Sequence, residues 1–577
     1  MSLIEVLFAT AIVAVVFMAI YGVFIVSVKI VTGSKARAGA LSLAVERTEA
    51  IRSMLYQEIG TVGGIPSGTL AQSENITLNN TPYIRRTFIG YGDDPADGLG
   101  GADENGITAD YKIVKVELTW VLRGVLQSYS HVTTVVPKGI ESLNGGGTLK
   151  LFVYDALAQP ITGATVRVVN TTGTSSIDVT TFTNSAGSVT FPGTPSGAGY
   201  QITVTKAGYT TARTYTSNAS NPNPTPGDLS VADTQTTSGT FFIDRFSGLD
   251  IRTWEPIKEE SWADEFTDAT KIQTSASSTV TGGELQLELD GAEYWQAGSA
   301  RSIAITPQYL SAWKEVRFTS ATPPSTVAKV KIYFDNAGTP TILSDAVLSG
   351  NSAGFTTSPI DLSGISTSTY PTLYLVSELS TGDITVTPNI GRLEVVYDKG
   401  PTPLPNISFT LRGDKTIGTT GAGAATYKFS GTYSTGASSA FSTTTMEWDT
   451  YTLDVTGGLY DISESCQPLP LVLSPNVSTG LDLYLSPAST HSLLVAVKDS
   501  SSGAIIPDAS VRLTRSGVDI TKISSNCGQV FYSSASQGTV SGGNSYTLEV
   551  SKAGYTSATL TEVEISGTSR VTVQLTP

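Results

Sequence analysis

The sequence predicts an α+β unit, built from a long N-terminal helix plus a small antiparallel sheet, followed by all-β sandwich domains. The chain begins with an almost unbroken apolar run from Val6 to Val28, which is long enough for about 35 Å of helix. Beyond it, short runs of Val, Ile and Tyr recur between Ser, Thr and Gly, a texture typical of β-sandwiches. A length of 577 residues allows about three to five domains.

The composition argues against a nucleic-acid-binding protein and against a disulfide-dense scaffold. Only 15% of the residues are charged and the net charge is −15, so most of the surface would repel nucleic acid. No nucleic-acid partner is therefore expected. The two cysteines, Cys466 and Cys527, are too few for a disulfide-dense scaffold.

The first element is a helix over residues 1–59. Past the apolar run, apolar residues recur at spacings of three and four from Leu41 to Ile59, which is the pattern of an amphipathic helix. Gly22 and Gly33 each cost about 1 kcal/mol relative to Ala inside a helix. Bends or local unwinding are therefore expected at these two positions.

A carboxylate marks the beginning of this helix. Glu5 stands at the edge of the apolar run, where an ionised side chain costs roughly 2.5 to 3.5 kcal/mol on insertion scales. It therefore needs a positive partner, and the nearest in sequence is the α-amino group of Met1. The whole segment, MSLIEVLFATAIVAVVFMAIYGVF, resembles the N-terminus of mature type IV pilins and type II secretion pseudopilins.

That resemblance implies a role in assembly. In the family, a short basic leader is removed, the new terminal amine is methylated, and this Glu neutralises the amine of a neighbouring subunit as it enters the filament. Carried over to this chain, Met1 is the methylated terminus and Glu5 is the assembly carboxylate. The family commonly loses helical structure in part of this segment inside the filament, and residues 14–22 are the matching stretch here.

The alternative is a plain membrane anchor that happens to carry one acidic residue. Lys29, Lys35 and Arg37 follow the apolar run, and the positive-inside rule alone would place the large C-terminal part in the cytoplasm. A removed basic leader would restore the outward orientation. Whether Met1 is the processed terminus or the initiator stays open.

Residues 60–140 are expected to form a four-stranded antiparallel sheet. The strings ENITLNN, YIRRTFIGY, DYKIVKVELTW and LQSYSHVTTVVP show the alternation of half-buried strands. Packing of this sheet on the outer half of the helix is what the pilin resemblance implies. A Gly-rich stretch over 141–147 then predicts a flexible linker.

The loop between the second and third of these strands concentrates acidic residues. Carboxylates this dense repel each other unless a cation is bound, and interleaved glycines permit the tight turns of a calcium loop. The alternative is a solvated acidic loop. The expected calcium ligands are Asp93, Asp97, Asp103, Asn105 and Asp110.

Three later segments share one plan, over residues 147–244, 404–486 and 489–577. The first and last contain the same string, Lys-Ala-Gly-Tyr-Thr, beginning at Lys206 and Lys552, which identifies a repeat. All three resemble carboxypeptidase regulatory-like and collagen-adhesin B-type β-sandwiches. Turn residues separate about seven short strands in each segment, as a Greek-key sandwich requires.

Residues 245–400 differ from this plan and resemble jelly-roll sandwiches of the carbohydrate-binding or discoidin-like kind. Aromatic faces can stack on sugar rings, but large aromatics in a sandwich more often pack in its core, and the core role is preferred here. The Pro-rich stretch at 401–405 predicts a stiff extended linker. The unit contains Trp254, Trp262, Trp295 and Trp313.

The cysteines fall in neighbouring segments. Cys527 occupies the turn of the last segment where the first repeat has Asn-Ser-Ala-Gly, and Cys466 lies near the end of the segment before it. A disulfide would therefore join two domains. Two separate buried thiols are the alternative.

Catalytic motifs are nearly absent. The string Gly350-Asn351-Ser352-Ala353-Gly354 matches a nucleophile elbow, but that motif needs a helix directly after it, and the following residues do not predict one. His131 and His491 are the only histidines, and neither has a triad or metal context. We therefore expect no enzyme.

These observations predict a structural subunit of an extracellular type IV pilus-like filament. Its partners would be copies of itself, the pilus assembly machinery and, before assembly, the cytoplasmic membrane. The sandwich domains would project outward. Two alternatives remain: a minor or tip pilin acting as an adhesin, and a glycan-binding surface protein anchored singly in the membrane.

Overall fold

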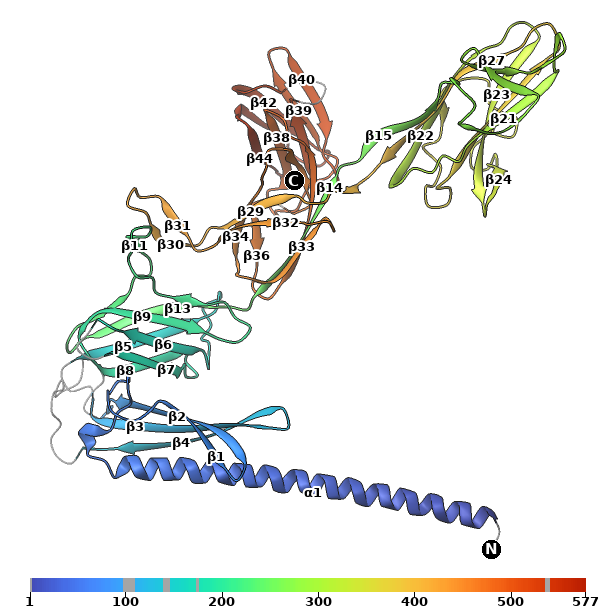
Figure 1. The fold of residues 1–577 in the computed structure, drawn as a ribbon. Coiled ribbons are helices and arrows are strands. Elements are labelled where there is room, and N and C mark those ends of the chain that lie inside the picture. The colour runs from blue at the N-terminus through green and yellow to red at the C-terminus, as the bar shows by residue number, and fades with distance from the viewer. Residues whose placement is uncertain (1–2, 97–108, 138–145, 173–175, 468, 535–539) are drawn as a thin grey trace.

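The computed structural model describes residues 3–96, 109–137, 146–172, 176–467, 469–534 and 540–577. The molecule is elongated, with the N-terminal helix at one end and β-sandwiches stacked away from it (Figure 1). One sandwich branches off to the side near the far end. The predicted fold class, an α+β unit followed by all-β sandwiches, is confirmed.

The helix α1 covers Leu3–Arg52 and is followed by a short 3-10 helix, η1, over Tyr56–Glu58. The expected end at Ile59 is therefore several residues too late. The buried ammonium of Lys112 donates hydrogen bonds to the carbonyl oxygens of Tyr56 and Ile59, at 2.6 and 2.8 Å, and so holds the turn that follows the end of α1. This burial lowers the pKa of Lys112 to about 8.

The expected breaks at Gly22 and Gly33 do not occur, since α1 is helical through both positions. A glycine costs only about 1 kcal/mol, whereas interrupting the helix would leave several backbone groups without partners. Gly33 also lies against Leu122, whose Cδ2 atom is 3.5 Å from where a Cβ would be. The second glycine is thus at a packed position.

An antiparallel sheet packs on the C-terminal half of α1. Its strands, in spatial order, are β1 (Ser73–Leu78), β2 (Thr81–Gly92), β3 (Tyr111–Leu122) and β4 (Val125–Val135). Alternate residues of β3 are buried, and the helix contributes small side chains that let the sheet approach closely. We call α1 and this sheet the sheet unit. Its core includes Ala36, Ala40, Leu43, Ala44, Ile51, Val114, Val116, Leu118 and Trp120.

The first sandwich has sheets ordered β10-β9-β6-β7 and β13-β5-β8. Its first strand pairs in parallel with its last, β5 with β13. Its strands are β5 (Gly147–Tyr154), β6 (Thr165–Asn170), β7 (Ile177–Phe182), β8 (Ser188–Thr194), β9 (Gly197–Thr205), β10 (Ala212–Arg213), β11 (Asn223–Pro224), β12 (Leu229–Val231) and β13 (Thr236–Phe242).

The third sandwich repeats this plan, with sheets β41-β38-β44 and β40-β39-β42-β43 and a parallel pairing of β38 with β44. The shared motif has the same role in both repeats. Lys206 donates to the carbonyl of Thr162 and Lys552 to that of Asp508, each 44 residues upstream. The strands are β38 (Ser492–Asp499), β39 (Ser510–Arg515), β40 (Val518–Ile523), β41 (Gln529–Ser533), β42 (Gly543–Ser551), β43 (Ala558–Ile565) and β44 (Thr568–Leu575).

The second sandwich begins earlier than the sequence suggested. Its first strand, β14 (Ser247–Glu255), pairs in parallel with its last, β37 (Ser478–Pro487). The expected boundary at residue 245 is therefore wrong, because β14 belongs to this sandwich. The other strands are β28 (Thr402–Pro403), β29 (Ser408–Gly413), β30 (Thr416–Thr419), β31 (Ala425–Tyr427), β32 (Ser430–Ser434), β33 (Ala440–Met446), β34 (Asp449–Val455), β35 (Tyr460–Ser465) and β36 (Leu471–Leu473).

The branching unit is inserted between β14 and β28, and we call it the side lobe. It packs one sheet ordered β17-β18-β27-β22-β25, with β15 paired to β27, against another ordered β16-β21-β26-β23-β24. Its strands are β15 (Lys258–Asp264), β16 (Ile272–Ala276), β17 (Ser278–Thr281), β18 (Glu284–Leu287), β19 (Leu289–Asp290), β20 (Glu293–Tyr294), β21 (Ala297–Ser302), β22 (Leu310–Ala321), β23 (Thr326–Asn336), β24 (Thr339–Ile342), β25 (Ile360–Asp361), β26 (Leu373–Thr381) and β27 (Asn389–Lys399).

Two expectations for this region need correction. Trp254 lies in β14, outside the side lobe, and donates its Nε1–H to Asp482 at 2.8 Å. The expected linker at 401–405 is in part a strand, since β28 pairs with the end of β14. Proline is tolerated there because β28 lies at the edge of its sheet.

Candidate functional site

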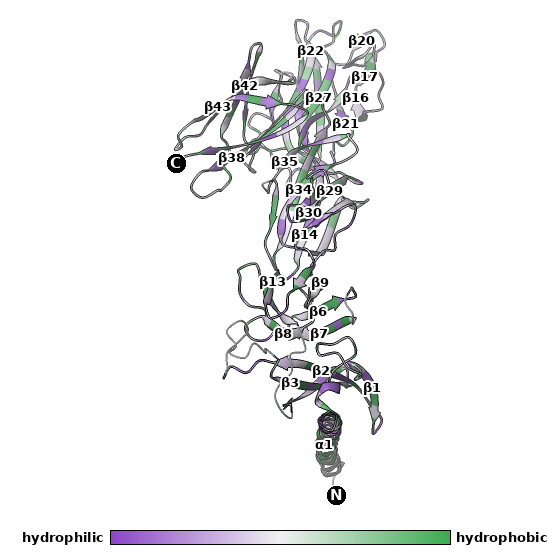
Figure 2. Cartoon of the chain, turned by 90° about the vertical axis from the view of Figure 1, so that its left-hand side faces the viewer, coloured by the Kyte–Doolittle hydropathy of each residue, from purple (hydrophilic) through white to green (hydrophobic). Residues whose placement is uncertain are grey.

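The N-terminal helix has two halves with opposite surroundings. The C-terminal half packs on the sheet, whereas the N-terminal half exposes apolar side chains. Figure 2 views α1 nearly along its axis and colours its hydrophobic residues green. By length and composition the helix is able to cross a membrane. The exposed apolar residues are Ile12, Val13, Val16, Phe17, Met18, Ile20, Tyr21, Val23, Phe24, Val26, Val28, Ile30 and Val31.

Glu5 lies in the first turns of α1, while its side chain and Met1 are outside the described residues. No basic residue occurs between Glu5 and Lys29, a separation of about 36 Å along a helix. Lys29 of the same helix therefore cannot neutralise Glu5. The pairing of Glu5 with an amine at Met1 stays a prediction.

The acidic loop is described only at its two ends. The backbone N–H of Asp94 donates to the Asp110 carboxylate, and the Asp110 N–H donates to the Gly92 carbonyl at 3.0 Å. These contacts hold the ends of β2 and β3 together beside Asp93. The other expected ligands, Asp97, Asp103 and Asn105, lie outside the described residues, so the calcium site stays a prediction.

A first joint connects the sheet unit to the first sandwich. Ile65, from the loop after η1, is 2% exposed and belongs to the core of that sandwich, where Phe88 and Tyr91 of β2 also pack. The backbone N–H of Asp178 in the sandwich donates to the Gly63 carbonyl at 2.6 Å. The two units therefore share a core. Sequence reasoning missed Ile65 because one apolar residue in a Gly-rich loop carries no periodic signal.

A second joint connects the first and second sandwiches. The β30–β31 hairpin of the second sandwich reaches back and pairs with β11 of the first. Asn221 donates its side-chain N–H to the Ile417 carbonyl at 2.8 Å, and Lys428 donates to the Thr211 carbonyl at 3.2 Å. Backbone pairing thus continues across the boundary.

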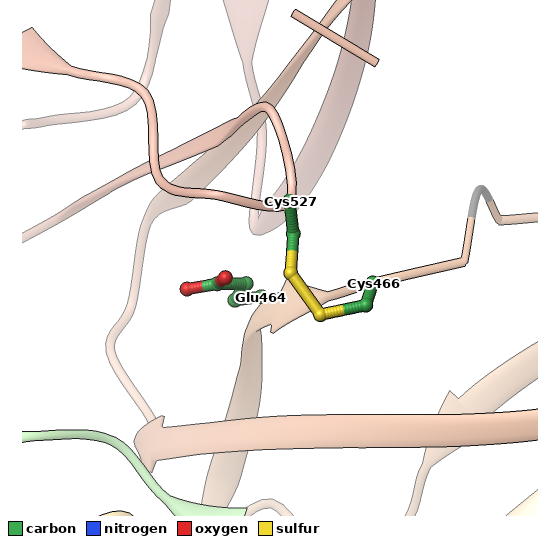
Figure 3. A group of neighbouring side chains, drawn as sticks. All are labelled: Glu464, Cys466 and Cys527. Carbon is green, nitrogen blue, oxygen red and sulfur yellow. A yellow bond between two sulfur atoms is a disulfide. The ribbon is translucent and has the colours of Figure 1, made fainter. Parts of the chain in front are cut away.

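A third joint holds the last two sandwiches together through a disulfide between Cys466 and Cys527, with sulfur atoms 1.98 Å apart (Figure 3). This is the pairing expected from the sequence. The Ser525 hydroxyl donates to Glu464 at 2.8 Å across the same boundary, and Leu494 of β38 is buried in the core of the second sandwich. Burial raises the pKa of Glu464, which the Ser525 hydrogen bond partly offsets.

The side lobe is attached in a different way. Its chain leaves through Pro256 and Ile257 and returns through Gly400 and Pro401, so two adjacent segments form a neck. Ile257 is 53% exposed. The neck is flanked by ion pairs of Lys258 with Glu255 and Glu260. We call the sheet unit and the three sandwiches joined in series the shaft.

The aromatic residues of the side lobe have mostly structural roles. Trp313 is fully buried and donates its Nε1–H to the Tyr370 carbonyl at 2.8 Å. Trp262 packs against the same core, whereas Trp295 is 46% exposed. Trp295 is therefore the tryptophan of this lobe most available to a ligand.

The elbow-like string is also structural. Asn351 is fully buried, and its side chain bonds the backbone of Ile332 and Leu343. The Ser352 hydroxyl donates to Asp345. Residues 343–361, all described, contain no helix after Ser352, so the strand-turn-helix geometry of a nucleophile elbow is lacking there.

A scan against protein-family models and a search of curated proteins find no match for this chain. Among solved structures, the chain is similar to the Bacillus anthracis TIE protein, with 11% identity, a TM-score of 0.16 and 81% of this chain covered. It spans 59% of the length of that protein.

Two further matches are pilins. The major pilin subunit BcpA of Bacillus cereus has 11% identity and a TM-score of 0.13, with 75% of this chain and 99% of that chain covered. The major pilin SpaD of Corynebacterium diphtheriae has 12% identity and a TM-score of 0.12, with 76% and 99% covered.

Proposed function

We propose that this protein is a structural subunit of an extracellular type IV pilus-like filament. The main support for this proposal is the contrast between the two halves of α1. The N-terminal half exposes apolar side chains, while the other half packs on the sheet. In water that surface must be covered, and copies of the same helix would cover it in a filament. Apolar contact of about 25 cal/mol per Å² buried would then supply most of the cohesion.

Before assembly the same half of α1 would lie in the cytoplasmic membrane. Transfer to the filament by the assembly machinery exchanges lipid contacts for helix contacts, so the apolar surface stays dry throughout. Met1, methylated after leader removal, and Glu5 would then pair between neighbouring subunits. A buried carboxylate is tolerated when it is paired, so this contact would set the axial register.

The shaft and the side lobe suggest how the rest of the subunit is used. The shaft would project from the filament as one body, because its joints share cores, backbone pairing and a disulfide. A second candidate is a minor or tip pilin with an adhesive lobe. It is favoured by the neck, which presents the side lobe, with its half-exposed Trp295, away from the shaft. A surface glycan would be its ligand.

Calcium binding in the acidic loop is a further part of the proposal. Such an ion would neutralise the loop between β2 and β3 next to Tyr91, which packs on the first joint. Millimolar calcium should raise the unfolding midpoint of the sheet unit relative to chelator, and Asp103→Ala should remove this difference. An identical midpoint with and without calcium would leave a solvated loop.

The test of assembly is substitution at Glu5. Glu5→Ala should leave the protein in the membrane yet abolish most filaments, and Glu5→Asp should retain more assembly because the charge is kept. Imaging of filaments by cryo-electron microscopy would show whether every subunit position carries the shaft and lobe, which separates the major subunit from a tip adhesin. Wild-type filament yield from Glu5→Ala would overturn the proposal.

A further inference from the structure

The hairpin tip between β3 and β4 lies beside the point where α1 leaves its exposed apolar half. Leu122 packs at Gly33 of the helix. Arg123 and Gly124 have φ values of 54° and 81°, the pair of positive φ angles that a two-residue type I′ hairpin turn requires. In Figure 1 this hairpin reaches along α1 toward its N-terminal half. The tip is therefore a rigid feature fixed next to the helix.

The exposed side chains of this tip are three apolar residues and one arginine. Val121, Val125 and Leu126 are 59%, 60% and 69% exposed, and Arg123 between them is also exposed. Single exposed apolar residues are common on soluble proteins. Val121 and Leu126 are cross-strand partners on one face of the hairpin, and Val125, opposite Leu122, lies on the other face. Both faces of the tip therefore suit a partly apolar partner.

The helix adds positive charge at the same level. Lys29, Lys35 and Arg37 are all exposed, and no Asp or Glu occurs between Glu5 and Glu46. The whole chain nevertheless carries a net charge of −15. We call these three cations, together with residues 121–126, the exit collar. Its charge is opposite to that of the protein as a whole.

The position of the exit collar matches the surface of a bilayer. The apolar run ends at Val28, and Gly33 lies five residues further, about 7.5 Å of helix rise. The polar layer on each side of the hydrocarbon core is roughly 5 to 7.5 Å deep. When residues 6–28 span the hydrocarbon, the tip therefore lies at the headgroups, where apolar side chains with adjacent cations bind well.

We infer that the exit collar docks the sheet unit onto anionic lipid headgroups before assembly. Arg123 and Lys29 pair with lipid phosphates, and Val125 and Leu126 enter the boundary below them. Lys35 and Arg37 lie just above the headgroups and add long-range attraction to the anionic surface. The inference rests on the membrane step of the proposed function. A lipid surface is favoured over a second copy because the exit collars of two copies would repel each other, whereas anionic headgroups complement them.

The experiment uses the full chain reconstituted in phosphatidylcholine vesicles, with or without phosphatidylglycerol. Cys466 and Cys527 are bonded to each other, so Val125→Cys supplies one thiol for an environment-sensitive fluorophore. Two reference variants carry the same label: Phe24→Cys, in the exposed apolar half of α1, and Ser128→Cys, exposed further along β4. A quencher attached to the lipid headgroup or acyl chain reports contact.

In anionic vesicles, we expect the headgroup quencher to quench a fluorophore at position 125 but not one at position 128. The acyl-chain quencher should quench a fluorophore at position 24. Adding Arg123→Glu should lower the contact at 125 by more than about five-fold, the contribution of one basic residue near an anionic surface, and leave position 24 unchanged. Added salt should weaken the contact at 125.

The outcomes distinguish docking of the exit collar from membrane insertion of α1. Quenching at 24 with a water-exposed label at 125 would overturn the docking and leave membrane insertion intact. No quenching at 24 would contradict insertion, and with it the proposed function. Protection of 125 that appears only as the protein-to-lipid ratio rises would assign the exit collar to a second copy, and would also overturn docking on lipid.

Discussion

The joints of the shaft and the neck of the side lobe connect neighbouring units in opposite ways. At the first and third joints one unit inserts a side chain into the core of the next, Ile65 in one case and Leu494 in the other. The neck has no such residue among those described. It consists of two chain segments with an exposed Ile257 and surface ion pairs.

This difference indicates how strongly each unit is coupled to its neighbours. Units that share a core separate only by exposing apolar surface, so the shaft should behave as one body. Exposed ion pairs contribute little, typically 0 to about 1 kcal/mol each. The side lobe should therefore reorient or unfold without disturbing the shaft.

The largest expected effect is at the third joint. Replacing both cysteines, by Cys466→Ser and Cys527→Ser, should destabilise the third sandwich by about 4 kcal/mol, because the bond closes a loop of 61 residues. Calorimetry of the full chain in detergent should show its transition at lower temperature, with the side-lobe transition unchanged.

Chemical reduction of the wild type is the matched control and should reproduce the double variant. Intact-mass measurement after alkylation checks the premise. Two alkylated thiols in the unreduced wild type would mean that the third joint lacks its covalent bond.

The next effect is at the first joint. Ile65→Ala should cost roughly 2 to 5 kcal/mol, the usual range for removing a buried Ile side chain, and should loosen the first sandwich and the sheet unit together. Hydrogen exchange along β5 and β2 measures both. Val62→Ala is the control, since Val62 is in the same loop but 61% exposed. Equal effects of the two substitutions would mean that the units do not share a core.

A smaller, pH-dependent effect is expected at Glu464. Its pKa is raised by burial in the folded protein, so between the ordinary carboxyl pKa and this raised value the folded state binds more protons than the unfolded state. Stability of the third joint should therefore fall as pH increases through that window and stay reduced at neutral pH.

Glu464→Gln keeps an acceptor for Ser525 and should raise the midpoint slightly at neutral pH while flattening its pH dependence. Glu564→Gln, at an exposed position of the third sandwich, should change neither. A variant at 464 that is less stable than wild type at pH 7 and unaffected at acidic pH would show that the charged carboxylate stabilises the joint.

The smallest effect is expected at the neck. Glu255 and Thr402 are cross-strand partners, so an Asn-Gly turn replacing residues 256–401 should close β14 and β28 into a hairpin. The shaft should then melt at an unchanged temperature and filaments should still form. A large loss of shaft stability would show that the side lobe is part of its core.

Local patterns in the sequence were enough to predict the helix, the four strands of the sheet unit and the repeat. The apolar run sets α1, alternation sets β3, and the repeated Lys206 and Lys552 strings occupy the same structural position. Cys466 and Cys527 could be paired because the repeat placed one of them at a known turn. Each of these signals involves residues close in sequence or aligned between repeats.

The tertiary structure alone decided the rest. The pairing of β14 with β37 and β33 shows that β14 belongs to the second sandwich and that the side lobe is an insertion. Strands so far apart in the chain carry no joint pattern in the sequence. In the sequence Lys112 looks like any other strand lysine, and only the fold brings its ammonium to the carbonyls of Tyr56 and Ile59 in the turn after α1. The exit collar likewise arises only when the fold brings Leu122 beside Gly33, since packing joins residues that the order of the chain keeps apart.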